Sequence, residues 1–183
     1  MQEKYFIASN SSEGFCSYYE DAFDITKFSR IYAIKGGSGT GKAFFMNTVA
    51  KKAEKMGYSV RYIYCSSDSS SLDGIIIEEP RVAVLDGTAP HIYEPKLVGA
   101  VDSIVDLGAF LDERMLSKSR NKIESITNEK KQGFERAYRH LKVYQLLSKN
   151  IEQIIYPCIK HEKIKMKTKI RLRFNNNSPF IIY

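Results

Sequence analysis

The sequence predicts an α/β domain in which a mostly parallel β-sheet is flanked by helices. Three observations lead to this fold class: an apolar, strand-like run at 31–34, a glycine-rich loop directly after it, and a helical repeat of apolar residues that begins at Lys42. Further apolar runs at 59–65 and 82–85 are expected to form two more strands. Strands that alternate with a helix along the chain are typical of parallel β-α-β units.

Length and composition fit a globular protein. The chain has 183 residues, of which 43% are hydrophobic and 27% are charged, which excludes a disordered chain and a disulfide-dependent miniprotein. Its three cysteines, Cys16, Cys65 and Cys158, are far apart and form no C-x-x-C pair, which argues against a disulfide framework and a zinc site. The sequence has neither the roughly 20 apolar residues of a membrane helix nor a secretion signal. We therefore expect a cytoplasmic protein without membrane contacts.

The glycine-rich loop matches the phosphate-binding P-loop, G-x-x-x-x-G-K, at residues 36–42. Its glycines let backbone N–H groups curve around an anion, and the following helix directs its positive dipole end toward the same place. Lys42 can reach the β- and γ-phosphates of a nucleotide. We therefore expect a nucleoside triphosphate at this loop, with these binding residues: Gly36, Gly37, Ser38, Gly39, Thr40, Gly41, Lys42 and Ala43.

The position after the lysine departs from the motif. A P-loop places a Ser or Thr hydroxyl there to bind magnesium, whereas this chain has Ala43 followed by Phe44. Asp86 ends the 82–85 run as the Walker B acid does, so it is expected to assist Lys42 in catalysis and to hold Mg²⁺ through water. The alternative is a turn-forming Asp-Gly, because Gly87 follows. Phosphate binding is thus better supported than phosphate chemistry.

Polar stretches at 66–74 and 86–91 follow two of the expected strands, and should converge with the glycine loop at one edge of the sheet. Asp68, Asp73 and His91 are their candidates for polarising a water or a substrate hydroxyl. For each of them, an Asx turn or a hydrogen bond within the loop is the alternative.

The C-terminal part of the sequence is helical in pattern and basic. An apolar stripe at 134–155, closed by Pro157, and a more polar stretch at 113–131 predict a helical hairpin over about 112–156 that turns near Gly133 and packs on the core. We assign 1–157 to the nucleotide-binding domain and 158–183 to a basic tail of undefined structure.

The basic residues are concentrated after position 116. Residues 1–116 contain 12 Lys and Arg against 16 Asp and Glu, a net charge of −4, whereas residues 117–183 contain 16 against 5, a net charge of +11. A basic tract of this kind can contact nucleic acid or an acidic partner weakly and without specificity, or can be a solvated helix.

Four segments resemble an uncharacterised group of bacterial ATP-binding P-loop proteins, regarded as ATPases, whose members contain two P-loop halves in tandem. The segments are KGGSGTGK at 35–42, CSSDSSSLDG at 65–74, VAVLDGTAPHIYEPKLVGAVDSIVDLG at 82–108 and FERAYRHL at 134–141. The resemblance covers residues 5–150, about one half of a member, and implies a P-loop NTPase fold with ATP at the glycine loop and Asp86 as the Walker B acid. Members usually read G-G-P-G-T-G-K-S-T, so Ser38 and the pair Ala43-Phe44 depart from the pattern.

The sequence therefore predicts a protein that binds ATP or GTP and hydrolyses it slowly or with a partner, such as a second P-loop half. One alternative is a small-molecule kinase whose acceptor lies at the 66–74 loop. Another is a catalytically silent nucleotide-binding module that docks on nucleic acid or on a partner protein through its basic C-terminal segment.

Overall fold

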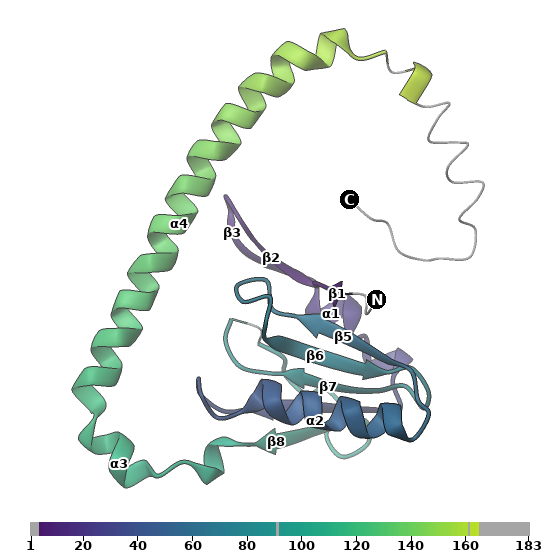
Figure 1. Cartoon of the computed structure of the whole chain (residues 1–183), viewed down its shortest axis with the longest axis vertical. Coiled ribbons are helices and arrows are strands. Elements are labelled where there is room, and N and C mark those ends of the chain that lie inside the picture. Colours follow the sequence, from purple (N-terminus) through teal and green to yellow (C-terminus); the bar gives the residue numbers. More distant parts are fainter. Residues whose placement is uncertain (1–3, 91, 161, 165–183) are drawn as a thin grey trace. The chain divides into compact units, whose positions relative to one another are not determined.

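The computed structural model describes residues 4–90, 92–160 and 162–164. The chain divides into two compact units, Met1–Lys142 and Val143–Tyr183. The first unit holds a six-stranded sheet with the strand order β1-β5-β6-β7-β4-β8 and a separate two-stranded sheet, β2-β3 (Figure 1). The predicted α/β class is therefore confirmed.

The strands are β1 (Lys4–Tyr5), β2 (Ala8–Ser11), β3 (Gly14–Ser17), β4 (Arg30–Lys35), β5 (Val60–Tyr64), β6 (Leu72–Ile77), β7 (Val82–Asp86) and β8 (Asp102–Asp106). The α-helices are α1 (Tyr19–Ala22), α2 (Lys42–Lys55), α3 (Glu113–Lys118) and α4 (Arg120–Ile155). Three short 3-10 helices are η1 (Ile25–Lys27), η2 (Gly108–Phe110) and η3 (Tyr156–Cys158).

Three of the five strand pairs in the large sheet are parallel: β1 with β5, β4 with β7, and β4 with β8. Strand β6 is antiparallel to both of its neighbours. The sequence does not predict this strand, because it predicts that residues 72–74 belong to the polar loop at 66–74. Asp73 and Gly74 are poor strand formers and concealed the apolar run that follows them. The connecting loop is therefore shorter, at 65–71.

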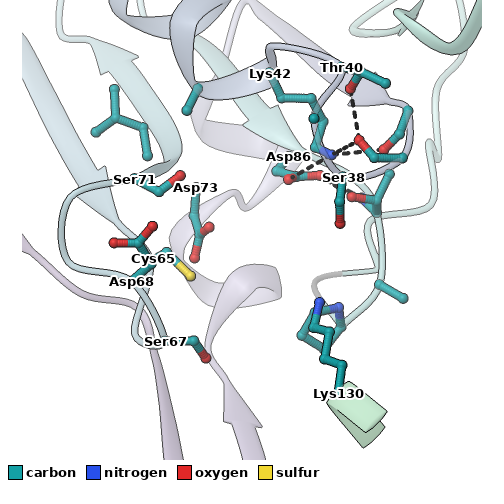
Figure 2. Close-up of a pocket in the computed structure, with 18 of the residues that line it drawn as sticks. Ser38, Thr40, Lys42, Cys65, Ser67, Asp68, Ser71, Asp73, Asp86 and Lys130 are labelled. Atoms are coloured by element: carbon teal, nitrogen blue, oxygen red, sulfur yellow. Dashed lines mark hydrogen bonds and ion pairs between the residues drawn. The ribbon is translucent and has the colours of Figure 1, made fainter. Parts of the chain in front are cut away.

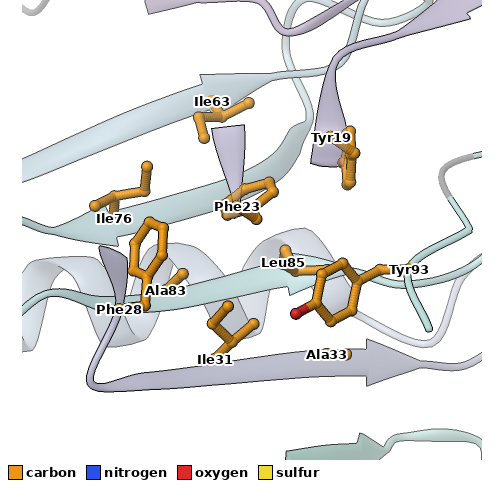
Figure 3. Close-up of a cluster of buried hydrophobic side chains, with 10 residues drawn as sticks. All are labelled: Tyr19, Phe23, Phe28, Ile31, Ala33, Ile63, Ile76, Ala83, Leu85 and Tyr93. Atoms are coloured by element: carbon orange, nitrogen blue, oxygen red, sulfur yellow. The ribbon is translucent and has the colours of Figure 1, made fainter. Parts of the chain in front are cut away.

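Two apolar clusters cover the two faces of the large sheet. Alternate residues of β4 separate between them, since Ile31 packs in the first cluster and Ile34 in the second. Helix α2 covers the second face with three buried residues at helical spacing, Met46, Ala50 and Ala53. The first cluster, drawn in Figure 3, gathers residues from α1, from the segment between α1 and β4, from four strands and from the segment after β7. These clusters fix the strand ends on which the site stands.

The predicted helical hairpin is wrong. Helix α4 runs for 36 residues through Gly133, and the break in the chain's helical path comes at Ser119, between α3 and α4. A glycine within a helix costs only about 1 kcal/mol relative to alanine, and here it stands between strong helix formers with no proline before Pro157. Glycine alone therefore did not make a turn.

Helix α4 has no buried residue, so the structure does not show the expected packing of its apolar stripe on the core. The division between the two compact units falls inside α4, after Lys142. Most of the basic tail at 158–183 lies outside the described residues. Although α4 is long, no helix in the described ranges is apolar enough over a sufficient length to cross a membrane.

Candidate functional site

The glycine loop joins the end of β4 to the start of α2, as the sequence predicted. It stands at the sheet edge where the parallel strands β4, β7 and β8 all end. Gly36 has a φ of +149°, and a Cβ at this position would lie 2.8 Å from the Thr40 hydroxyl. Gly41 caps α2 in the left-handed conformation, with φ of +85°. The loop therefore requires glycine at both of its ends.

Several amides of this loop remain available for a ligand. In the described chain, Thr40 N donates to Gly37 O at 3.4 Å, whereas the amides of Ser38, Gly39 and Gly41 have no acceptor. The first turn of α2 follows directly, and it brings the positive end of a 14-residue helix to the same place. Backbone donors and a helix dipole that converge in this way favour an anion.

Lys42 lies across the opening of the loop. Its Nζ donates to Gly36 O at 2.8 Å and to Gly37 O at 3.0 Å, and lies 3.6 Å from Asp86 Oδ2 (Figure 2). The side chain is only 13% exposed. A mostly enclosed ammonium is therefore held beside the loop amides, where a phosphate group would contact both.

Asp86 forms the turn that is one of its two interpretations from the sequence, and it also faces Lys42. Its Oδ1 accepts hydrogen bonds from the Thr88 amide, at 2.9 Å, and from the Thr88 hydroxyl, so it forms the turn that follows β7. Its Oδ2 faces Lys42. The turn orients the carboxylate, and one of its oxygens remains directed at the lysine.

Ala43 packs beside the second apolar cluster and has no oxygen to offer a metal. The nearby Thr40 hydroxyl donates to Gly37 O at 2.9 Å. Among the described residues, no group of three or more His, Cys, Asp or Glu side chains can hold a metal ion. Mg²⁺ is commonly bound by one or two carboxylates together with substrate phosphates and waters, and Asp86 fits such a set as its single protein ligand.

A cavity of about 1350 Å³ lies over the loop and continues to the ends of β5 and β6. Its walls include every predicted binding residue from Gly36 to Ala43, together with Asp86, Asp68 and Asp73. The structure thus brings these sequence candidates to one place. The remaining candidate, His91, lies outside the described residues.

Asp73 and Asp68 occupy different environments within this cavity. Asp73 is 5% exposed, whereas Asp68 is exposed and its Oδ1 accepts bonds from the amide and the hydroxyl of Ser70. These bonds hold the pKa of Asp68 below its ordinary value. Asp68 therefore forms the Asx turn that was its alternative interpretation, and Asp73 is the enclosed carboxylate.

Two further features were not found from the sequence, and the first of them lies outside the cavity lining. Tyr93 donates from its hydroxyl to Asp102 Oδ1 at 2.6 Å, and Asp102 Oδ2 accepts from the amides of Lys96 and Leu97 at 2.9 and 2.7 Å. Lys35 Nζ donates to the carbonyls of Gly87 and Tyr93. These bonds tie residues 93–97 to Lys35 and Asp102. An acid that follows a tyrosine by nine residues is not a pattern that the sequence alone makes recognisable.

The other missed feature is the wall formed by α4. Lys130, Phe134 and Tyr138 line the cavity, and the Tyr138 hydroxyl donates to Asn10 Oδ1 at 2.9 Å. Their i, i+4 spacing places them on one side of the helix. The sequence contains this spacing, but an apolar stripe on a helix predicts core packing and not the wall of a cavity.

Comparisons of the chain with protein-family models, with curated proteins and with solved structures found no match. The site's geometry must therefore support any functional conclusion.

Proposed function

We propose that this protein binds ATP, or GTP, with its phosphates on the glycine loop and Lys42, as a P-loop NTPase does. The observation that carries the proposal is the position of Lys42, whose ammonium lies at the loop opening within 3.6 Å of the Asp86 carboxylate. The unbonded amides of Ser38, Gly39 and Gly41 and the helix that follows are suited to the same anion. The resemblance of residues 35–42 and 82–108 to the bacterial ATP-binding family agrees with it.

Hydrolysis by the chain alone should be slow. Ala43 removes the hydroxyl that normally binds magnesium, and Gly87 occupies the place of the catalytic glutamate of many ATPases. Mg²⁺ would then be held by the phosphates, by water and by Asp86, and would neutralise phosphate charge. The alternative of a catalytically silent module, docked through its basic C-terminal segment, predicts binding with no phosphate release.

Calorimetry on Lys42→Ala tests the proposal. The variant should bind ATP about ten- to a hundredfold more weakly, because it removes a charge-assisted contact of roughly 1.5–3 kcal/mol. Lys51→Ala is the matched control: Lys51 is an exposed cation of the same helix and does not line the cavity. If both variants bind ATP as tightly as the unmodified chain, the glycine loop is a turn and the proposal fails.

A further inference from the structure

The cavity contains a second compartment beyond the glycine loop, defined by Cys65, Ser67, Asp68, Ser71 and Asp73. These residues follow β5, form the connecting loop and begin β6. In Figure 2 they lie across the cavity from Ser38, Lys42 and Asp86. The whole cavity, at about 1350 Å³, exceeds the roughly 300–1,000 Å³ of a typical ligand site, so it has room for more than a nucleotide.

The strand order places this compartment beyond the terminal phosphate. Lys42 reaches the β- and γ-phosphates in a P-loop, and here it stands beside Asp86 at the end of β7. Strand β6 pairs with β7 on the side opposite to β4 and its loop. Along this edge of the sheet, the start of β6 therefore lies beyond Asp86 as seen from the glycine loop. A molecule in the compartment would face the phosphate that is transferred.

A β-bulge sets the direction of Asp73. In the pairing of β5 with β6, Ile63 is opposite Gly74 and Tyr64 is opposite Leu72, so Asp73 is the extra residue. Consequently Leu72 packs in the same apolar cluster as Ile75, although residues three apart in a regular strand face opposite ways. Bulges of this kind redirect one side chain, and they are frequent beside active sites.

A buried tyrosine holds the backbone of Asp73. The Tyr19 hydroxyl donates to its backbone carbonyl at 3.1 Å, and Tyr19 is itself buried. On β7, Leu85 pairs with Gly74, so Asp86 and Asp73 come next on neighbouring strands at the same edge of the sheet. An enclosed carboxylate therefore stands one strand away from the group that contacts Lys42.

The side chains that line the compartment indicate which kind of ligand it would bind. Hydroxyls of Ser67 and Ser71, the Asn10 amide and the carboxylates of Asp68 and Asp73 suit a ligand with several hydroxyl groups. Those carboxylates, with Asp86, would repel a second anion. The rings of Phe15, Phe134 and Tyr138 line the same cavity and suit the flat face of a sugar or a base.

We propose that this compartment binds a neutral compound carrying a vicinal diol, a nucleoside or a sugar, as the acceptor of the γ-phosphoryl group. The inference rests on the nucleotide binding proposed above. An acceptor oxygen forms a bond to the γ-phosphorus, the bond from that phosphorus to the β–γ bridging oxygen breaks, and the acceptor's proton passes to the Asp73 carboxylate. The products are the phosphorylated acceptor and ADP. Slow hydrolysis without an acceptor follows, because water is not the intended nucleophile.

The test measures ADP formation from Mg²⁺-ATP with two sets of neutral probes: the four ribonucleosides, and glucose, ribose, glycerol and inositol. At least one probe should raise ADP formation tenfold or more, with a phosphorylated product visible by mass spectrometry. The corresponding nucleoside monophosphates and glucose 6-phosphate should not, because the compartment is acidic. The set that responds distinguishes a nucleoside from a sugar.

Asp73→Asn should lower the acceptor-dependent rate about a hundredfold or more, as loss of a general base does, and leave the Kd for ATP within threefold. Asp21→Asn, at an exposed carboxylate of α1 that does not line the cavity, is the matched control and should keep the rate within threefold. If Asp73→Asn does not fold, Ser71→Ala replaces it and should raise the acceptor KM with the Kd for ATP unchanged.

Three outcomes would overturn the inference. The first is ATP binding with no response to any neutral probe, which leaves the proposed nucleotide binding intact. The second is an Asp73→Asn variant that binds ATP tenfold more weakly, because the compartment would then hold part of the nucleotide itself. The third is an unchanged acceptor-dependent rate in Asp73→Asn. Absence of ATP binding in the unmodified chain would instead refute the proposed function.

Discussion

The Lys42 ammonium lies 3.6 Å from the Asp86 carboxylate, and the two residues come from opposite ends of the predicted nucleotide motif. Their proximity follows from the sheet, because β4 and β7 are adjacent parallel strands in which Ile34 pairs with Asp86. The end of β7 is therefore beside the base of the loop. A separation of 3.6 Å is long for a charge-assisted hydrogen bond, so Asp86 holds the ammonium less tightly than the carbonyls of Gly36 and Gly37, which accept from it at 2.8 and 3.0 Å.

Gly36→Ala should damage nucleotide binding more than Gly37→Ala. A methyl group at Gly36 would lie 2.8 Å from the Thr40 hydroxyl and 3.4 Å from Gly108 N, at a φ of +149° that alanine rarely adopts. Strain of this kind costs on the order of 1–3 kcal/mol. A methyl group at Gly37 meets nothing within 4 Å. Calorimetry with ATP should show at least a tenfold loss for the first variant and less than threefold for the second; equal losses would contradict this account of the loop.

Much of the site was predictable because it is local in sequence. The strand at 31–34, the loop at 36–41 and the helix from Lys42 are specified by a change of period and a glycine cluster within about 25 residues. Asp86 was also recognisable, because an uninterrupted apolar run leads to it. Local patterns of this kind depend little on the remainder of the fold.

The missed elements depend on contacts between distant residues. Strand β6 is defined by its pairing with β5 and β7, and the bulge at Asp73 is invisible without the register. The continuity of α4 through Gly133 depends on the propensities of its neighbours, which outweigh one unfavourable residue. Sequence periodicity alone does not predict the strand register, the bulge or the continuity of the helix.

Tyr93→Phe should destabilise the fold by about 1.5–3 kcal/mol near neutral pH, because it removes a hydrogen bond to a buried carboxylate. Burial raises the pKa of Asp102, but bonds from Tyr93 and from the Leu97 and Lys96 amides outweigh it and hold this pKa below its ordinary value. A lowered folded-state pKa contributes stability above the unfolded value of about 3.9, and that stability is lost as the pH falls through the folded-state value.

The difference in unfolding free energy between Tyr93→Phe and the unmodified chain should therefore shrink below about pH 4, as Asp102 becomes protonated in both. Urea unfolding at pH 7, 5 and 3.5 measures it. Tyr58→Phe, at an exposed tyrosine, is the control and should change little at any pH. A Tyr93→Phe difference that is independent of pH would show that the bond does not act through the Asp102 charge.

Gly133→Ala should raise the stability of α4, because Gly133 lies inside a continuous helix and a Cβ there meets nothing within 4 Å. The gain should be about 0.5–1 kcal/mol in helix stability. Circular dichroism during thermal unfolding measures it, with Gly57→Ala as the opposite case, since Gly57 has a φ of +90° after α2. A loss of helical signal in Gly133→Ala would restore the helical hairpin that the sequence suggested.

Ala43→Thr should make nucleotide binding more dependent on magnesium. In the unmodified chain no side-chain oxygen stands at position 43, so chelation of Mg²⁺ should change ATP affinity only modestly and steady-state hydrolysis should be very slow. Threonine restores an oxygen next to Lys42, and should raise both the magnesium dependence of binding and the rate of ATP turnover.

Ala43→Val is the control, because valine has the shape of threonine without the hydroxyl, and it should raise neither quantity. Addition of Asp86→Asn to Ala43→Thr should abolish the gain, since Asp86 would hold the same ion. The opposite result is an unmodified chain that already hydrolyses ATP at an ordinary magnesium-dependent rate and that Ala43→Thr does not change. Another oxygen near the loop would then bind the metal. The Thr40 hydroxyl, 2.9 Å from Gly37 O, is the first to test by substitution.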